Sequence, residues 1–206
     1  MTEHRDVAAF DDRARAYESG RHARLHFEIV HRTLDLALAT APQPSRVLDV
    51  GCGTGYLLRT LADRLPDAEA LDGVDAAPTM IEVAQAKAKE ERADDARLSF
   101  RQGVAEHLPF EPGTFDLVVS TTSFDHWADQ QAGLTDCARV LRPGGHLVLV
   151  DQFSVLLAPT LMRSRRGKAR TRHRATKLVT DAGFESPRWH HVYATIINGV
   201  TAQKPA

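Results

Sequence analysis

Residues 46–55, RVLDVGCGTG, constrain the fold of this chain more than any other stretch. Val47, Leu48 and Val50 form a short apolar run, which is typical of a buried strand. Glycines follow at positions 51, 53 and 55, and a helical pattern of leucines begins directly after them. A strand, a glycine turn and a helix in this order indicate an open α/β sheet whose backbone approaches a nucleotide-like ligand, because glycine has no Cβ to collide with it.

The spacing of the glycines separates two kinds of ligand. A dinucleotide fingerprint, G-x-G-x-x-G, needs its third glycine at position 56, which is Tyr56 here. An NAD-dependent oxidoreductase is therefore the least favoured alternative. The pattern G-x-G-x-G, preceded by an acid, resembles the first motif of the class I S-adenosylmethionine-dependent methyltransferases, where the turn passes under the methionine and ribose of the cofactor. The resemblance implies a cofactor site shaped by Asp49, Gly51, Cys52, Gly53 and Gly55.

A second strand is expected over residues 69–75, and it ends in an acid. Asp75 lies 20 residues after Gly55, about the offset at which an acid can hold a ribose in such folds. A carboxylate accepts both hydrogen bonds of a vicinal diol. The alternative is that Asp75 caps a helix starting near Pro78. We expect ribose binding by Asp75, with Ala76 beside it in the cofactor site.

Residues 97–110 predict a third strand followed by GVAEHLPF. The small-molecule branch of the resembled family often carries G-D-A-E-x-L-P-F there, and its Asp contacts the adenine amino group. Val104 stands in that place, so contact with adenine is expected from backbone N–H groups at Val104 and Ala105. Glu106 is expected to be a local structural acid.

Residues 114–121 read as a fourth buried strand, so Thr121 and the residues up to Trp127 should emerge where open α/β sheets bind ligands. His126 is a candidate proton acceptor there, because histidine titrates near neutral pH. The alternative is that His126 only packs, as we expect of Trp127. A helix over about 128–141, a break at 142–145 and a fifth strand at 146–151 follow, as in the same family.

Two N-terminal helices are expected over residues 4–18 and 22–38. Phe10, Ala14 and Tyr17 resemble the lid of small-molecule members of the family, in which the Tyr closes over the cofactor. Packing alone is the favoured role for Phe10, and for Tyr17 both roles stay open. His22 and His26 share a helical face. They are expected to be a solvent-facing or active-site-lining pair rather than a metal site, because no third ligand is recognisable.

The composition favours one domain over residues 1–206. The resemblance implies its parts: an N-terminal helical lid (1–42), a cofactor-binding core (43–151) and a substrate-covering segment with a C-terminal hairpin (152–206). The chain is 43% hydrophobic with a net charge of −1, which gives no general attraction to nucleic acid. Cys52 and Cys137 form neither a zinc pattern nor a disulfide framework. No signal peptide or membrane span is recognisable, so a cytoplasmic location is expected.

A dense run of cations occupies residues 163–174. It is expected to be a solvated connection, although it could receive an anionic acceptor or an RNA backbone. The run lacks aromatic side chains for stacking bases, which disfavours RNA. Two strands over 189–194 and 195–202 should close the sheet as an antiparallel hairpin.

The sequence therefore predicts an α/β fold: a seven-stranded, mostly parallel Rossmann-like sheet with a C-terminal antiparallel hairpin and helices on both faces. The resemblance implies methyl transfer from S-adenosylmethionine to a small molecule, leaving S-adenosylhomocysteine. Tyr17 and His126 are expected to face the reacting centre. The alternatives are an RNA or protein methyltransferase and a catalytically silent cofactor-binding module. The acceptor, its reacting atom, the use of a general base and the oligomeric state, including a homodimer, stay open.

Overall fold

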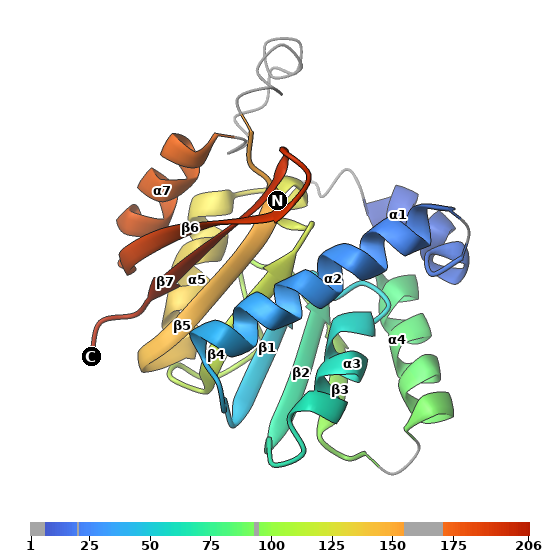
Figure 1. Ribbon diagram of the computed structural model, residues 1–206. Helices are drawn as coiled ribbons and strands as arrows, with labels where there is room; N and C mark the ends of the chain where they lie inside the picture. The colour runs from blue at the N-terminus through green and yellow to red at the C-terminus, as the bar shows by residue number, and fades with distance from the viewer. Residues whose placement is uncertain (1–6, 20, 93–94, 155–170) are drawn as a thin grey trace.

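A single seven-stranded sheet organises the part of the chain that the computed structural model describes, residues 7–19, 21–92, 95–154 and 171–206. The strand order is β3-β2-β1-β4-β5-β7-β6, with the first five parallel and β7 antiparallel to both its neighbours (Figure 1). The strands are β1 (Arg46–Val50), β2 (Ala70–Asp75), β3 (Leu98–Gln102), β4 (Phe115–Thr121), β5 (Leu141–Gln152), β6 (Glu185–Tyr193) and β7 (Ile197–Gln203). The predicted fold class is confirmed.

Helices cover both faces of the sheet (Figure 1). The described helices are α1 (Val7–Arg13), α2 (Arg21–Thr40), α3 (Tyr56–Arg64), α4 (Pro78–Glu91), α5 (Gln130–Val140) and α7 (Arg172–Asp181), with short 3-10 turns η1 (Ala14–Ala16) and η2 (Phe124–His126). Helices α2, α3 and α4 lie on one face, and α5 and α7 on the other. None of the helices within these described ranges is long and apolar enough to cross a membrane.

Strand alternation divides the core into two layers. Val47 packs in one apolar cluster with Leu34 of α2 and Leu61 of α3. Its neighbour Leu48 packs in the other cluster with Leu134 of α5, because successive side chains of a strand point to opposite faces. Every residue of β4 is buried, as expected for a parallel strand covered on both sides.

The structure differs from the expected boundaries at three places. The first N-terminal helix is divided, since α1 ends at Arg13 and η1 follows. The fifth strand starts at Leu141 rather than at residue 146, because Leu141 already pairs with Phe115 of β4. A register shift follows, and regular pairing resumes where His146 pairs with Leu117. Strand β6 starts at Glu185, four residues before the expected hairpin. Residues 155–170, which include most of the cation run, lie outside the described residues.

Candidate functional site

The glycine turn lies between β1 and α3, against the end of β2. The backbone N–H groups of Gly51 and Cys52 both donate to the Val74 carbonyl, at 2.7 and 3.0 Å. Gly51 has φ of 77°, and a Cβ there would lie 2.2 Å from the Ser123 Oγ. Glycine is thus required at position 51 by the backbone conformation and by the close approach of the loop after β4.

Asp75 fastens this turn to the start of α4. Its carboxylate accepts hydrogen bonds from the N–H groups of Gly53 and Ala77, both at 2.9 Å. Burial raises the pKa of Asp75, and these backbone hydrogen bonds oppose that rise. The bond from Ala77, directly before Pro78, resembles the capping role considered above. The ribose role of Asp75 is untested by these contacts and stays a prediction.

Two polar atoms are buried in the floor of the site with no hydrogen-bond partner among the described residues, the Asp49 Oδ1 and the Thr121 Oγ1. Such orphaned atoms are uncommon in native proteins and call for an explanation. Burial, and secondly the nearby charge of Asp75, raise the pKa of Asp49 to about 8. Within the described part of the chain, Asp49 therefore lacks a cation that would stabilise its charged form.

These residues line one cavity at the carboxyl ends of the parallel strands. Eleven of the twelve predicted site residues belong to its lining: Tyr17, Asp49, Gly51, Cys52, Gly53, Asp75, Ala76, Val104, Ala105, Thr121 and His126. Three acids are among the lining residues: Asp49 and Asp75 from this list, and Glu106. None of the described residues that line the cavity is a lysine or an arginine. The cavity is therefore suited to a ligand that carries positive charge.

Gly55 is the one predicted site residue that does not line the cavity. With φ of 77° it precedes α3, and a Cβ there would lie 2.6 Å from the Phe100 ring. The structure thus gives Gly55 a packing role behind the turn. Cys52 does line the cavity, and burial raises the pKa of its thiol well above the ordinary value, so the thiol stays protonated.

The N-terminal segment, residues 7–19, contributes part of the lining of the cavity. Tyr17 and Phe10 both line it, and the Phe10 ring meets the His126 ring edge-on with centroids 4.9 Å apart. Phe10 therefore contacts a candidate catalytic residue in addition to packing. Burial, and then the charge of Asp75, raise the pKa of Tyr17, so its phenol can donate a hydrogen bond near neutral pH and does not act as a base.

The loop after β3 also lines the cavity. Val104 forms an isolated antiparallel bridge with His107, while both Val104 and Ala105 line the cavity. The Glu106 carboxylate accepts a hydrogen bond from the Asp129 N–H at 2.8 Å, as expected of a local structural acid. Trp127 is buried in the core, as expected, and its indole N–H donates to the Ser123 Oγ at 3.3 Å.

Helices α2 and α4 contribute further lining residues, of which Met80 of α4 was missed by sequence reasoning. His26 and Val30 lie four residues apart in α2, and both reach the cavity. The His26 ring meets the Tyr17 ring edge-on at 5.1 Å, and burial lowers the pKa of His26. The lining position of His26 agrees with one of the two roles expected for it, and Val30 belongs to the expected apolar face of this helix, on which it also reaches the cavity.

The expected histidine pair and the cation run are described by the structure only in part. No group of three or more His, Cys, Asp or Glu among them could hold a metal ion, and the side chain of His22 is not described. Arg172 and Arg174 are the described members of the cation run. Arg172 donates to the Asn198 Oδ1 at 2.6 Å and lies over the Trp189 ring.

Comparisons with known proteins show which family this chain is similar to. Residues 47–145 match a family described as a methyltransferase domain. The demethylmenaquinone methyltransferase of Thermus thermophilus is 42% identical over 120 residues, which cover 58% of this chain and 52% of that protein. The chain thus spans about half the length of this curated relative.

Solved structures show the same fold at lower identity. A methyltransferase in complex with the Haloferax volcanii Trm112 methyltransferase activator has a TM-score of 0.77 and 22% identity, covering 98% of this chain and 97% of that one. A Haemonchus contortus N-methyltransferase, solved with phosphomonomethylethanolamine and S-adenosylhomocysteine, has a TM-score of 0.75 and 18% identity, covering 100% of this chain and 60% of that one.

Proposed function

Because this chain belongs to the class I S-adenosylmethionine-dependent methyltransferases, we propose that it transfers a methyl group from S-adenosylmethionine to a small-molecule acceptor. The observation that carries the proposal is the acidic cavity, in which the Asp49 Oδ1 and Thr121 Oγ1 lack partners among the described residues. A ligand with an ammonium and a sulfonium would supply the missing positive charge, and its ammonium would satisfy the orphaned acceptors.

The residues present fit this cofactor. Asp49 and Thr121 would hold its amino group, Asp75 its ribose hydroxyls, and the backbone around Val104 and Ala105 its adenine. When bound, S-adenosylmethionine supplies an electrophilic methyl carbon on a sulfonium. The protein's main contribution is then to hold an acceptor in line and exclude water, which is worth an effective molarity on the order of 10⁵–10⁸ M.

Two side chains that line the cavity, His126 and Tyr17, would act on the acceptor. Phe10 packs against His126 and would exclude water from that side. The His126 imidazole would take a proton from a weakly acidic acceptor group, which typically adds roughly 10²–10⁴-fold in rate. The Tyr17 phenol, held protonated, would orient an acceptor or cofactor oxygen by donating a hydrogen bond. A neutral amine or a thiolate acceptor would need no base.

The acceptor class is proposed from the curated relative. That relative is named for demethylmenaquinone, which favours a small aromatic or quinone acceptor here. We further infer that the protein is located in the cytoplasm and has no nucleic-acid partner. Its oligomeric state is open, and a homodimer is one option. A macromolecular acceptor is the second candidate, since the cation run at residues 163–174 could receive an RNA backbone or an acidic protein surface.

Calorimetry followed by a methyl-transfer screen tests the proposal. We expect S-adenosylhomocysteine to bind and NADH not to bind, and radiolabelled methyl to appear on a member of a panel of quinols, phenols, amines, thiols and carboxylates. Turnover only on RNA or protein, lost when Arg165, Arg166 and Arg170 become Ala, would favour the macromolecular alternative. Binding without transfer to any of these acceptors would favour a silent cofactor-binding module. A preference for NADH would overturn the assignment.

A further inference from the structure

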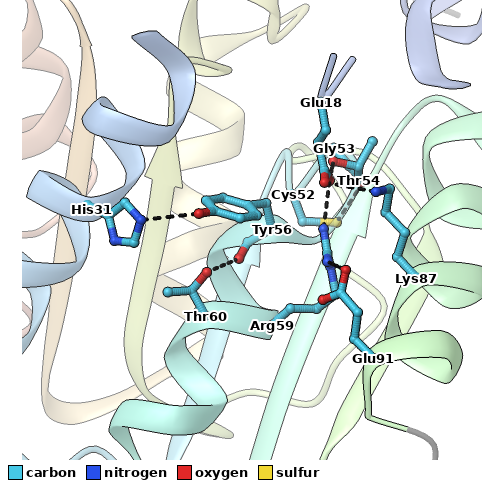
Figure 2. Close-up of polar contacts among 10 residues, drawn as sticks. All are labelled: Glu18, His31, Cys52, Gly53, Thr54, Tyr56, Arg59, Thr60, Lys87 and Glu91. Atoms are coloured by element: carbon cyan, nitrogen blue, oxygen red, sulfur yellow. Dashed lines mark hydrogen bonds and ion pairs between the residues drawn. The ribbon is translucent and has the colours of Figure 1, made fainter. Parts of the chain in front are cut away.

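A buried ion-pair network joins the N-terminal segment to the glycine turn (Figure 2). Glu18, which follows Tyr17, points its carboxylate at side chains from three other elements. Its Oε1 accepts hydrogen bonds from the Thr54 Oγ1 at 2.5 Å and from the Arg59 Nη2 at 2.6 Å, and its Oε2 lies 3.0 Å from the Lys87 Nζ. Arg59 also pairs with Glu91 of α4.

The network is buried and charged. The side chain of Arg59 is 3% exposed and that of Glu18 is 12% exposed, whereas the side chain of Glu91 is 44% exposed. Burial alone would raise the pKa of Glu18, but hydrogen bonds from Thr54 and Lys87 and the charge of Arg59 outweigh burial and lower it. Glu18 is therefore ionised at neutral pH, and removing its charge leaves Arg59 with one carboxylate partner instead of two.

Glu18 stands between two groups that face the cavity. Tyr17, on one side of it in the chain, and Thr54, which donates to it, both line the cavity. Thr54 lies between Gly53 and Gly55, so fixing its hydroxyl also restricts the turn. The segment has a second attachment within α1. There Asp11 accepts a hydrogen bond from the Thr79 N–H at the start of α4, at 2.9 Å.

We propose that Glu18 is a positioning residue that latches the N-terminal segment onto the glycine turn, holding Tyr17 over the cavity and Thr54 in the turn that shapes it. Release of the ligand then requires that the contacts of Glu18 break. The identity of that ligand rests on the proposed function, while the latch itself is a property of the protein.

Glu18→Gln tests the latch, and Glu91→Gln is its matched control. Both substitutions remove one carboxylate partner of Arg59. Only Glu18, however, connects the N-terminal segment to the glycine turn. The probe is S-adenosylhomocysteine, measured by calorimetry and by its dissociation rate. Trypsin cleavage after Arg13 and Arg15, which are exposed, reports opening of the segment without any ligand.

We expect Glu18→Gln to weaken S-adenosylhomocysteine binding about tenfold, mainly through faster dissociation, because small displacements of positioning groups carry large penalties. KM for S-adenosylmethionine should rise while KM for the acceptor stays unchanged. Trypsin should cut Glu18→Gln faster than the unmodified protein, and Glu91→Gln should match the unmodified protein in every one of these measurements. Thr54→Val should shift the affinity in the same direction if Glu18→Gln fails to fold.

Equal losses in Glu18→Gln and Glu91→Gln would overturn the proposal, because the network would then only stabilise helices α3 and α4. Unchanged binding and unchanged cleavage in Glu18→Gln would overturn it as well. If the unmodified protein fails to bind S-adenosylhomocysteine, the proposed function fails. The cleavage comparison then still decides whether Glu18 latches the segment.

Discussion

We expect Asp49 to make the binding of S-adenosylhomocysteine sensitive to pH, because burial raises the pKa of its carboxyl to about 8. At pH 7 about nine in ten Asp49 side chains are then protonated. A bound ammonium favours the charged carboxylate and lowers this pKa. Binding at pH 7 should therefore release close to one proton.

The magnitude follows from the populations. Only the ionised form binds the cation well, so the affinity scales with the ionised fraction, about 1 in 11 at pH 7 and about 1 in 101 at pH 6. S-adenosylhomocysteine should therefore bind about ninefold more weakly at pH 6 than at pH 7. The ligand's own α-amino group stays protonated in this window, since such groups titrate near 7.7–8.0.

Isothermal titration calorimetry in buffers of different ionisation enthalpy measures both the affinity and the released protons. Asp49→Asn is the reference, because it keeps the shape of the side chain and cannot titrate. We expect the Asp49→Asn variant to bind weakly with no pH slope between 6 and 7. A change of less than twofold in the unmodified protein, or an equal slope in the variant, would refute the reasoning.

In the unliganded protein, Asp49→Asn should also remove a loss of stability that occurs at alkaline pH. A group whose pKa is raised by folding stabilises the folded state at low pH, and that contribution is lost as the pH rises through its folded value, here about 8. The thermal stability of the unmodified protein should thus fall between pH 7 and pH 9 relative to the variant. Parallel melting curves at both pH values would count against the raised pKa.

Three further predictions concern other residues. Asp75→Ala should weaken S-adenosylhomocysteine binding by about tenfold or more, or about 1.4 kcal/mol; unchanged affinity by calorimetry would reject the ribose role. His126→Ala should lower kcat by roughly 10²–10⁴-fold on an acceptor that must lose a proton, with S-adenosylhomocysteine affinity within threefold; an unchanged kcat and a flat pH profile would exclude proton transfer. Leu34→Ala, at a fully buried position, should lower the free energy of unfolding by about 2–5 kcal/mol in urea titrations; a loss below 1 kcal/mol would contradict the packing of α2 on the sheet.

Local patterns predicted the sheet and the floor of the site well. Val47 and Leu48 marked a buried strand because both faces of β1 are covered, and Gly51 marked a backbone conformation that few other residues adopt. The offset from Gly55 to Asp75 placed the second acid because parallel strands end at a common edge. These features are fixed within short stretches of chain, so the sequence displays them.

The features that escaped prediction depend on partners far apart in the chain. Glu18 and Arg59 are 41 residues apart, and no local periodicity links them. Met80 lines the cavity at the start of α4, where it packs with Ala14 of the N-terminal segment. Gly55 was expected in the cofactor site but packs against the Phe100 ring instead. Phe100 comes from β3, so this contact is likewise not visible in the local sequence.

The position of β7 has a consequence for how this protein folds as it is synthesised. β7 inserts between β5 and β6, yet it is the last of the described strands to leave the ribosome. Until then the long edge of β5 has no partner for its peptide groups, and unpaired edges invite pairing with another chain. We therefore expect ribosome-bound or truncated chains that stop before residue 197 to be prone to aggregation, however complete their glycine turn and cavity floor.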